Sequence, residues 1–394
     1  MSERWLTCTP VCFLGDASFF RRDSGLMCRG LQAAGVDCQA VMPGPAQPED
    51  EPDLLRVDAA DLRSEKWWRQ TGACGVVLYA WGSPRYFPVA RAIRRAGIFL
   101  VLNQDSGGLV SPLAGVREWW DERRRVAGAV SGVPWRGRFL RGALRELTVG
   151  LALVDPMRAA HLRQGDVIAA VSPRAAEHYR RLCRVYGGEK QARRVKVIPH
   201  PVNPIFRCGE GRRQRRVIAV GRWDDVRQKR TGMMCRVLER VLKRDGDVKA
   251  VIVGRATEEL RGWQAGLSPG VAERVELTGR LEHGELAERM ASSQVLYCSS
   301  AYESFHIASG EALCSGCSVV AAKATSLASF GWFAGEGCGT LAKQDDEEGH
   351  VAALMEEMKA WDEERRNAGQ ISRLWQARLN AAAVAGGVVA LRAR

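Results

Sequence analysis

The sequence lacks an apolar run of about twenty residues, which is the length that a helix needs to cross a bilayer. We therefore expect no transmembrane helix. Residues 1–16 carry a charged pair and then an apolar stretch, and they do not have the layout of a cleaved secretory signal. The sequence also contains no short internal repeat. These absences indicate a cytoplasmic protein without a repeat architecture.

Cysteine is not scarce, but no second Cys-x-x-Cys pair accompanies Cys314-x-x-Cys317. The 12 cysteines are scattered, and most are embedded in apolar segments. In a chain of this length we interpret them as reduced, buried thiols that act as small hydrophobic residues. A redox or metal-binding role for Cys314 and Cys317 is the alternative.

The chain is long enough for two domains of ordinary size, and its composition is that of a globular protein. It has 394 residues, of which 46% are hydrophobic and 26% are charged. The net charge of +13 favours phosphate-bearing partners: a nucleotide, a nucleic acid or an anionic membrane. Arginine is much commoner than lysine, and a coding bias toward arginine would give the same excess.

Strand-like and helix-like segments alternate along both halves of the chain. The expected strands cover residues 6–14, 38–42, 75–80, 98–103, 216–222, 249–254 and 275–280, and helices are expected at 25–35 and 88–96. Alternation of this kind is typical of a parallel sheet that is covered by helices on both faces. The predicted class is α/β with two such halves.

Residues 294–322 contain the most informative pattern. An apolar strand (295–298) is followed by a polar loop, a short helix that begins near Ile307, and a second apolar strand (319–322). Glu303 is expected in the loop and Glu311 in the first or second turn of the helix. Ligands of open α/β sheets bind beyond the carboxyl ends of the strands, and a helix N-terminus favours phosphate. This stretch therefore predicts an anion site with two acceptors for sugar hydroxyls.

The same residues carry a resemblance to a known family. Glu-Ser-Phe-x-Ile-x-x-x-Glu-Ala-Leu, followed by Ser-Gly-Cys-Ser-Val-Val-Ala-Ala, is similar to the E-x7-E signature of retaining family 4 glycosyltransferases. The resemblance implies the GT-B architecture, with two Rossmann-like, doubly wound parallel-sheet domains that face each other across a cleft. The clearest departure is His306, where the family prefers glycine. An ordinary βαβ unit of another doubly wound protein is the alternative interpretation.

The resemblance also implies roles for individual residues. Residues 216–230 resemble the family's G-R-x(n)-K-G element, in which Arg222 and Lys229 would bind the donor diphosphate. Glu311 would accept hydrogen bonds from the ribose, and Glu303 would lie near the donor sugar. The remaining donor-binding candidates are Gly254, Gly279, Arg280, Phe305, His306 and Ile307. A solvated basic loop is the alternative for Arg222 and Lys229.

The domain boundaries follow from the same resemblance. Residues 165–173 and 195–203 resemble late strands of the family's N-terminal domain, although His200 and Pro201 replace the usual Asn-Gly. We expect an acceptor domain over 1–205, a donor domain over 206–360 and a C-terminal helical segment over 361–394. Asp105, in a polar turn after an apolar strand, is the candidate for acceptor contact and catalysis. A turn-stabilising role is the alternative for Asp105.

Residues 117–150 form an unusually basic segment with aromatic residues. In the helix expected after Trp135, apolar residues that include Leu140 and Leu144 share one side, and arginines occupy the other. Such a helix can lie on an anionic membrane, here the inner membrane face, or bind an acidic acceptor. The alternative is that its apolar side packs on its own domain.

The leading functional interpretation is a retaining, metal-independent glycosyltransferase that uses a UDP-, GDP-, ADP- or dTDP-sugar and no other cofactor. The acceptor would be a glycan, a lipid-linked glycan or a small molecule. Front-face attack needs no protein nucleophile, which agrees with the lack of a recognisable catalytic triad in the sequence. A non-catalytic scaffold of the same fold that binds a nucleotide or glycan is the alternative. A nucleic-acid binder has only the charge in its favour.

Overall fold

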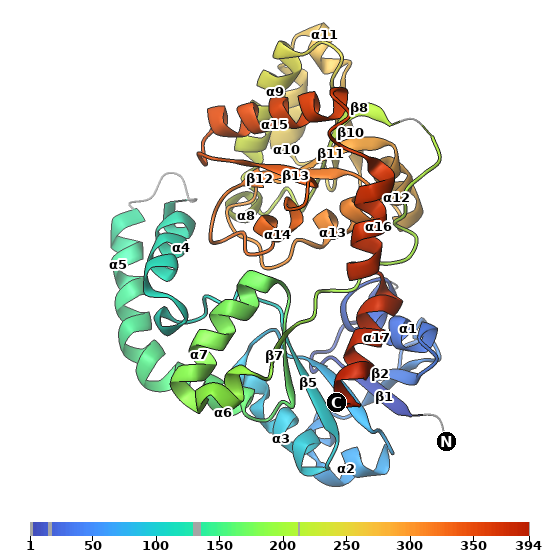
Figure 1. The fold of residues 1–394 in the computed structure, drawn as a ribbon, viewed down its shortest axis with the longest axis vertical. Helices are drawn as coiled ribbons and strands as arrows, with labels where there is room; N and C mark the ends of the chain where they lie inside the picture. Colours follow the sequence, from blue (N-terminus) through green and yellow to red (C-terminus); the bar gives the residue numbers. More distant parts are fainter. Residues whose placement is uncertain (1–2, 15–17, 129–134, 212, 394) are drawn as a thin grey trace. The chain divides into compact units, whose positions relative to one another are not determined.

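Two parallel β-sheets organise the residues described by the computed structural model, which are 3–14, 18–128, 135–211 and 213–393 (Figure 1). The chain divides into two units, each with its own sheet. Unit 1 comprises Met1–Asp121, Gly137–Asn203 and Arg378–Arg394, and unit 2 comprises Glu122–Arg136 and Pro204–Ala377. The segment expected at 361–394 is thus divided between the two units, and the chain passes from unit 1 to unit 2 at Asn203 and Pro204.

The sheet of unit 1 has seven parallel strands among the described residues, in the order β3-β2-β1-β4-β5-β6-β7. They are β1 (Arg4–Cys8), β2 (Asp37–Pro43), β3 (Leu54–Val57), β4 (Gly75–Tyr79), β5 (Phe99–Gln104), β6 (Val167–Ala170) and β7 (Val195–Val197). Side chains alternate between the two faces: Leu6 and Val76 belong to one buried cluster, and Trp5 and Val77 to the other. Both faces are buried, as expected for a doubly wound sheet.

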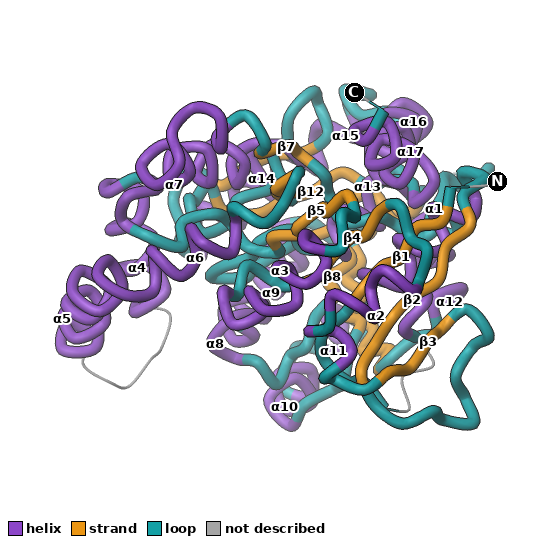
Figure 2. The backbone as a smooth tube through the Cα atoms, turned by 90° about the horizontal axis from the view of Figure 1, so that it is seen from below, coloured by secondary structure: helices purple, strands orange, loops and turns teal. Residues whose placement is uncertain are grey.

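Helices cover both faces of this sheet, and Figure 2 shows them around the strands. The helices with residues in unit 1 are α1 (Asp23–Ala33), α2 (Glu65–Gln70), α3 (Phe87–Arg95), α4 (Val116–Gly128), α5 (Trp135–Arg145), the π-helix Glu146–Val154, α6 (Asp155–Leu162), α7 (Pro173–Ala192) and α17 (Ala381–Arg392). Helix α17 packs on α1 so closely that a Cβ atom on Gly30 would lie 2.4 Å from the carbonyl oxygen of Ala381. The C-terminal helix is therefore part of unit 1.

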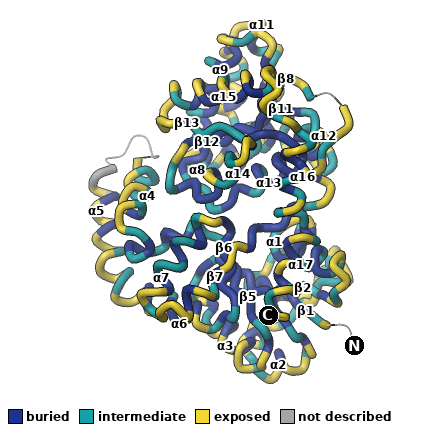
Figure 3. The backbone as a smooth tube through the Cα atoms, in the orientation of Figure 1, coloured by how far each residue is buried: buried dark blue, intermediate teal, exposed yellow. Residues whose placement is uncertain are grey.

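The sheet of unit 2 has six parallel strands within the described ranges, in the order β10-β9-β8-β11-β12-β13. They are β8 (Gln214–Val220), β9 (Lys249–Val253), β10 (Val275–Gly279), β11 (Ser293–Tyr297), β12 (Ser318–Ala322) and β13 (Gly339–Ala342). All five residues of β12 are buried, because Val-Val-Ala-Ala fits between two helical layers. Figure 3 shows the inner strands of the sheets as mostly buried and the outer faces of the helices as exposed.

The helices of unit 2 include the short α8, which follows the first strand of its sheet. They are the second part of α4, the first two residues of α5, α8 (Val226–Lys229), α9 (Thr231–Arg244), α10 (Glu258–Ala265), α11 (Pro269–Ala272), α12 (His283–Ala291), α13 (Ile307–Cys314), α14 (Phe330–Phe333), α15 (Glu347–Asp362) and most of α16 (Ala368–Leu379). Trp375 of α16 is fully buried against the rings of Trp332 and Phe333. This contact places the greater part of α16 in unit 2.

The predicted α/β class with two parallel sheets is confirmed. The first strand is shorter than expected, because β1 ends at Cys8 and does not reach residue 14. Pro10 lacks the N–H group that would continue the hydrogen-bonded ladder. In the described part of the chain, no helix is both long and apolar enough to span a membrane.

Candidate functional site

Three glycines form a closely packed backbone surface at the carboxyl ends of β8, β9 and β10. The amide of Gly254 donates to the carbonyl of Gly279 at 2.8 Å, and the amide of Gly221 donates to the carbonyl of Val253 at 3.1 Å. A Cβ atom on Gly254 would lie 2.1 Å from the carbonyl oxygen of Gly221. Gly254 and Gly279 have φ values of 130° and 72°, which favour glycine. The sequence thus permits a flat backbone surface at the edge where ligands of such sheets bind.

The turn between β8 and α9 carries the two cations expected to bind phosphate. Asp225 caps the short α8, because its Oδ1 accepts from the amide of Gln228 at 3.1 Å. Arg222 lies before this helix with 76% of its side chain exposed. Lys229 ends the helix and is buried. Of these two cations, Arg222 is therefore exposed and Lys229 is held in place.

Hydrogen bonds to backbone carbonyls join this turn to the loop after β11. The amide of Ala301 donates to the carbonyl of Gln228 at 2.7 Å, and the amide side chain of Gln228 donates to the carbonyl of Tyr302 at 3.1 Å. Ser299 Oγ donates to the carbonyl of Lys229 at 2.6 Å. Two segments that are distant in the sequence thus form one continuous surface at the sheet edge.

Lys229 and Glu303 form a buried ion pair on this surface. Lys229 Nζ lies 2.6 Å from Glu303 Oε1, and each side chain is 10% exposed. Burial raises the pKa of Glu303, but the positive charges of His306 and Lys229 outweigh this effect and lower it overall. Glu303 is therefore a carboxylate at neutral pH, and Lys229 fixes its position.

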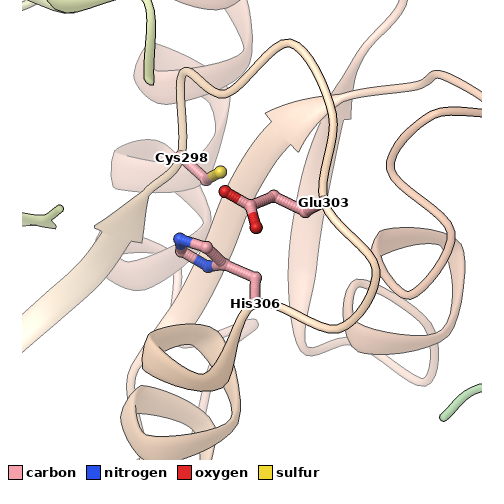
Figure 4. Close-up of side chains that lie close together, drawn as sticks. All are labelled: Cys298, Glu303 and His306. Atoms are coloured by element: carbon pink, nitrogen blue, oxygen red, sulfur yellow. The ribbon is translucent and has the colours of Figure 1, made fainter. Parts of the chain in front are cut away.

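His306 occupies a backbone conformation that favours glycine. Its φ of 64° and ψ of 78° are left-handed, and its ring packs on Phe330 with centroids 5.5 Å apart. His306 Nδ1 is 2.7 Å from Ser309 Oγ, which fixes the ring. Figure 4 shows the side chains of His306, Cys298 and Glu303 converging. Burial lowers the pKa of His306, but Cys298 and Glu303 raise it overall.

Glu311 lies in the second turn of α13, as the sequence predicts, and Glu303 lies in the loop before this helix. Glu311 is buried, and burial raises its pKa to about 7, against a smaller downward effect of His306. Phe305 is buried against Phe333, and Ile307 is the first residue of the helix. The motif therefore offers an ionised Glu303 and a Glu311 that titrates near neutral pH.

Unit 1 contains a separate cluster around Asp105, at the carboxyl end of β5. Asp105 Oδ1 lies 3.1 Å from Nε2 of the buried His200, whose Nδ1 lies 3.8 Å from Asp23 Oδ1. Burial lowers the pKa of His200, but the two carboxylates raise it overall. Asp23 has a φ of 49°, an uncommon value for a residue other than glycine. The arrangement could hold a proton beside Asp105.

The comparisons with known proteins agree with the motif. Residues 214–359 match the family model described as Glycosyl transferases group 1. The matched region is similar to that family and covers less than half of the chain. It includes Arg222, Lys229, Glu303, His306 and Glu311, so the resemblance is confirmed at the level of glycosyl transferases group 1. A search of curated protein sequences found no match.

Solved structures with a similar fold include the following three. The lipopolysaccharide outer core galactosyltransferase WaaB is 13% identical, with 99% of each chain covered and a TM-score of 0.62. HepE from Anabaena in complex with UDP is 13% identical, with 99% of each chain covered and a TM-score of 0.64. Sucrose-phosphate synthase from Thermosynechococcus elongatus is 17% identical, with 99% of this chain and 98% of that chain covered and a TM-score of 0.61. At these identities the likeness establishes the GT-B fold.

The expected donor-binding residues of the group 1 region differ in how far they are buried. Arg222 and Arg280 are exposed, whereas Lys229, Glu303 and Glu311 are buried. The sequence did not single out Cys298, because a cysteine at the end of an apolar strand has the pattern of a core residue. Nor did it predict that His200 would lie between Asp23 and Asp105. The sequence offered one indication that His200 is unusual: it stands where the family usually has asparagine.

The Cys314-x-x-Cys317 pair of the group 1 region is not a disulfide in this structure. Both thiols are free and buried. Cys317 Sγ donates to the carbonyls of Met290 at 3.0 Å and Ser293 at 3.3 Å. Burial raises the pKa of Cys317 to about 11, which opposes thiolate formation. These contacts favour a structural role for Cys317.

The basic segment at 117–150 does not bury its whole apolar side. On α5, Phe139 and Ala143 are buried, and Phe139 packs edge-on against Trp120 with centroids 4.5 Å apart. Leu140 and Leu144 are 61% and 64% exposed. The alternative, in which the apolar side packs on its own domain, thus holds for Phe139 and Ala143 and does not account for the two leucines.

Proposed function

We propose that the protein is a glycosyltransferase that moves a sugar from a nucleotide-diphosphate-sugar to an acceptor, with retention of the anomeric configuration and without a metal ion. The group 1 match over 214–359 and the GT-B fold support the reaction class. HepE, which shares the fold, was solved in complex with UDP, and a UDP-sugar is therefore the first donor to test. The acceptor class is a glycan, a lipid-linked glycan or a small molecule.

The observation that carries this proposal is the ion pair between Lys229 and Glu303. It brings the cationic turn and the Glu303 loop to the same sheet edge, 2.6 Å apart at their closest polar atoms. An ammonium group has three donors, so Lys229 can hold Glu303 and also donate to a phosphate oxygen. The donor diphosphate would then lie beside Lys229, next to the glycine surface around Gly254.

The remaining residues supply the other contacts of the donor. Arg222 is exposed and can turn toward the phosphate, where its planar guanidinium would bind two oxygens. Glu311 would accept hydrogen bonds from the ribose hydroxyls as a carboxylate. Gly279 and Arg280 would lie at the base through their backbone. The backbone from Phe305 to Ile307 would contact the phosphate or sugar at the start of α13.

The chemistry proposed is front-face displacement. The bond from the anomeric carbon to the leaving phosphate oxygen breaks, the acceptor oxygen bonds to the same face, and the leaving phosphate takes the acceptor proton. Negative charge grows on the diphosphate, and Lys229 and Arg222 stabilise it. Positive charge grows on the sugar, and the carboxylate of Glu303 stabilises it. The two cations supply the charge that a metal would otherwise provide.

Release of nucleoside diphosphate tests the reaction. The chain is incubated with UDP-, GDP-, ADP- and dTDP-sugars in the presence of a chelator, and a thermal-shift screen of the same compounds selects the donor. We expect one nucleotide class to raise the melting temperature and to be released on turnover or slow hydrolysis. Binding without any release would favour a non-catalytic scaffold. No binding would contradict the proposal.

The exposed leucines of α5 favour a second element of the proposal, peripheral contact with an anionic membrane. Leu140 and Leu144 are more than half exposed on a helix that also carries Arg141 and Arg145. Apolar side chains beside arginines are typical of helices that lie in a membrane interface. This contact would keep a lipid-linked acceptor close to the enzyme.

A further inference from the structure

Three side chains of different chemistry converge at the start of α13. The candidate ligand atoms of Cys298, Glu303 and His306 all lie within 4.8 Å of one another (Figure 4). Cys298 follows β11, Glu303 lies in the loop, and His306 precedes the first residue of α13. One strand, one loop and one helix start thus bring sulfur, oxygen and nitrogen to one point.

We propose that Cys298, Glu303 and His306 bind a zinc ion. Thiolate, imidazole and carboxylate are the ligands that Zn²⁺ takes in proteins, and the mixed set with sulfur disfavours Mg²⁺ and Ca²⁺. In a tetrahedral zinc site the ligand atoms are about 3.3 to 3.6 Å apart. Side-chain adjustments of about 1 Å therefore close the group around an ion. Three protein ligands leave a fourth position open.

The orientation of His306 supports this site. Its Nδ1 is 2.7 Å from Oγ of Ser309, a residue with no exposed surface. A histidine ligand commonly has its second ring nitrogen held by such a partner, which directs the first nitrogen to the metal. Here Nε2 is the nitrogen that remains for the ion. The φ of 64° at His306 shows that the chain accepts an uncommon backbone conformation for a histidine at this position.

The charges of the group also fit a divalent cation. A thiolate and a carboxylate together offset the charge of Zn²⁺, which lowers the cost of burying the ion. Lys229, 2.6 Å from Glu303, adds one positive charge beside the group. Cys298 and His306 are 3% and 8% exposed, and the side chain of Glu303 is 10% exposed. All three candidate ligands are therefore largely buried.

Zinc binding would regulate donor binding, and this consequence rests on the proposed function. Glu303 would coordinate the ion when it is needed beside the donor sugar. The carboxylate now paired with Lys229 would be shared with the metal. We therefore expect Zn²⁺ to weaken binding of UDP or a UDP-sugar and to inhibit turnover.

Direct metal binding tests the site without reference to catalysis. The chelator-treated full chain is titrated with Zn²⁺ against a chromophoric indicator, and with Co²⁺ by absorption spectroscopy. We expect one tight equivalent and, for cobalt, a thiolate-to-metal charge-transfer band with the intense visible bands of a tetrahedral site. Cys298→Ser and His306→Gly should each weaken zinc binding by about 100-fold or more. Ser309→Ala should weaken it by about 10- to 100-fold.

The matched control is Cys12→Ser, which removes an exposed thiol outside the group and should leave zinc binding unchanged. Zinc affinity that does not change in Cys298→Ser and His306→Gly, or a cobalt spectrum without the thiolate band, would overturn the proposal. The donor is tested separately, with chelator present. If no nucleotide binds under those conditions, the proposed function fails, whereas the cobalt spectrum still decides the zinc site.

Discussion

Lys229 Nζ and Glu303 Oε1, 74 residues apart in the sequence, lie 2.6 Å apart in a largely buried ion pair. The pair joins the end of α8 to the loop before α13. Removal of one partner of a buried pair leaves the other charge without compensation, which costs more than the pair itself contributes. The same pair therefore determines both local stability and the geometry offered to a donor.

Lys229→Met should lower the free energy of unfolding by about 3 kcal/mol and abolish nucleotide binding, because Glu303 is left as a buried carboxylate without its ammonium partner. Glu303→Gln should also destabilise, and the double variant should lose less than the sum, with a coupling of about 1 to 3 kcal/mol. Urea denaturation measures all four proteins. The exposed pair of Lys243 and Glu239 is the control, and Lys243→Met should change stability by less than about 0.5 kcal/mol. If the losses in the free energy of unfolding of the two single variants simply add in the double variant, the two charges are not coupled and the prediction is wrong.

His306→Gly should be more stable than His306→Ala by about 1 kcal/mol, because the φ of 64° is costly for any residue with a Cβ atom. Both variants lose the contact with Ser309, so the comparison isolates the backbone. Thermal unfolding in the presence of a chelator measures the difference. Ser304→Gly and Ser304→Ala are the matched control pair. The glycine variant should not be the more stable of the two, because Ser304 is a described residue whose φ is not positive. Equal stability of the two His306 variants would show that the backbone relaxes without the ring.

The ionisation of Glu311 should lower the free energy of unfolding as the pH rises from 4.5 to about 7. Its pKa is about 7 in the folded state, against 4.5 for an unperturbed glutamate, so the folded state binds more protons in this window. The loss from this group should be about 3 kcal/mol across the window. Urea denaturation at several pH values, compared with Glu311→Gln, isolates the effect. Parallel pH profiles for the two proteins would contradict the shifted pKa.

The same titration should appear in donor binding. If Glu311 accepts hydrogen bonds from the ribose as a carboxylate, UDP affinity rises with pH until Glu311 is ionised, near pH 7. Glu311→Gln should bind UDP weakly and without this rise. Calorimetric titration with UDP from about pH 5.5 to about pH 8 brackets this ionisation and measures the affinity. An affinity that falls over this range, with the phosphate ionisation of UDP accounted for, would place the ribose elsewhere.

The sequence predicts the fold and the donor motif well because both depend on local patterns. Apolar strands such as β12 are recognisable by composition, and the spacing of Glu303 and Glu311 is fixed by one loop and one helix. The cluster of Asp23, Asp105 and His200 could not be predicted, since it depends on three chain segments meeting at one sheet edge. A single sequence does not specify such long-range contacts.

Cys298 shows a second reason why part of the site was missed. A cysteine at the end of an apolar strand has the same pattern whether it packs in the core or faces a polar group. Its pKa is raised by burial and lowered overall by His306, and this depends on the position of a ring further along the chain. The predicted length of β1 was wrong for a simpler reason. The apolar pattern of the sequence continues past Pro10, but the hydrogen-bonded strand ends at Cys8.

Gly254→Ala should destabilise the protein by about 2 kcal/mol or more and weaken nucleotide binding. The new Cβ would lie 2.1 Å from the carbonyl oxygen of Gly221, and the φ of 130° is rarely adopted by alanine. The matched control is Gly262→Ala in α10, where the Cβ meets no atom within 4 Å. That substitution should raise stability by about 0.5 to 1 kcal/mol, because alanine favours a helix interior. Equal effects of the two substitutions, measured by urea denaturation, would contradict the close packing of the glycine surface.

Leu140→Ser with Leu144→Ser should release the protein from anionic vesicles without unfolding it, because both leucines are more than half exposed. The measurement is co-flotation with vesicles of phosphatidylglycerol and phosphatidylcholine, compared with phosphatidylcholine alone. The control is Leu14→Ser, which replaces a leucine of 60% exposure outside α5 and should leave flotation unchanged. High salt should weaken wild-type binding, since the arginines beside the leucines attract the anionic surface. Wild-type flotation that does not depend on anionic lipid, or that the double variant retains, would show that the exposed leucines serve another partner.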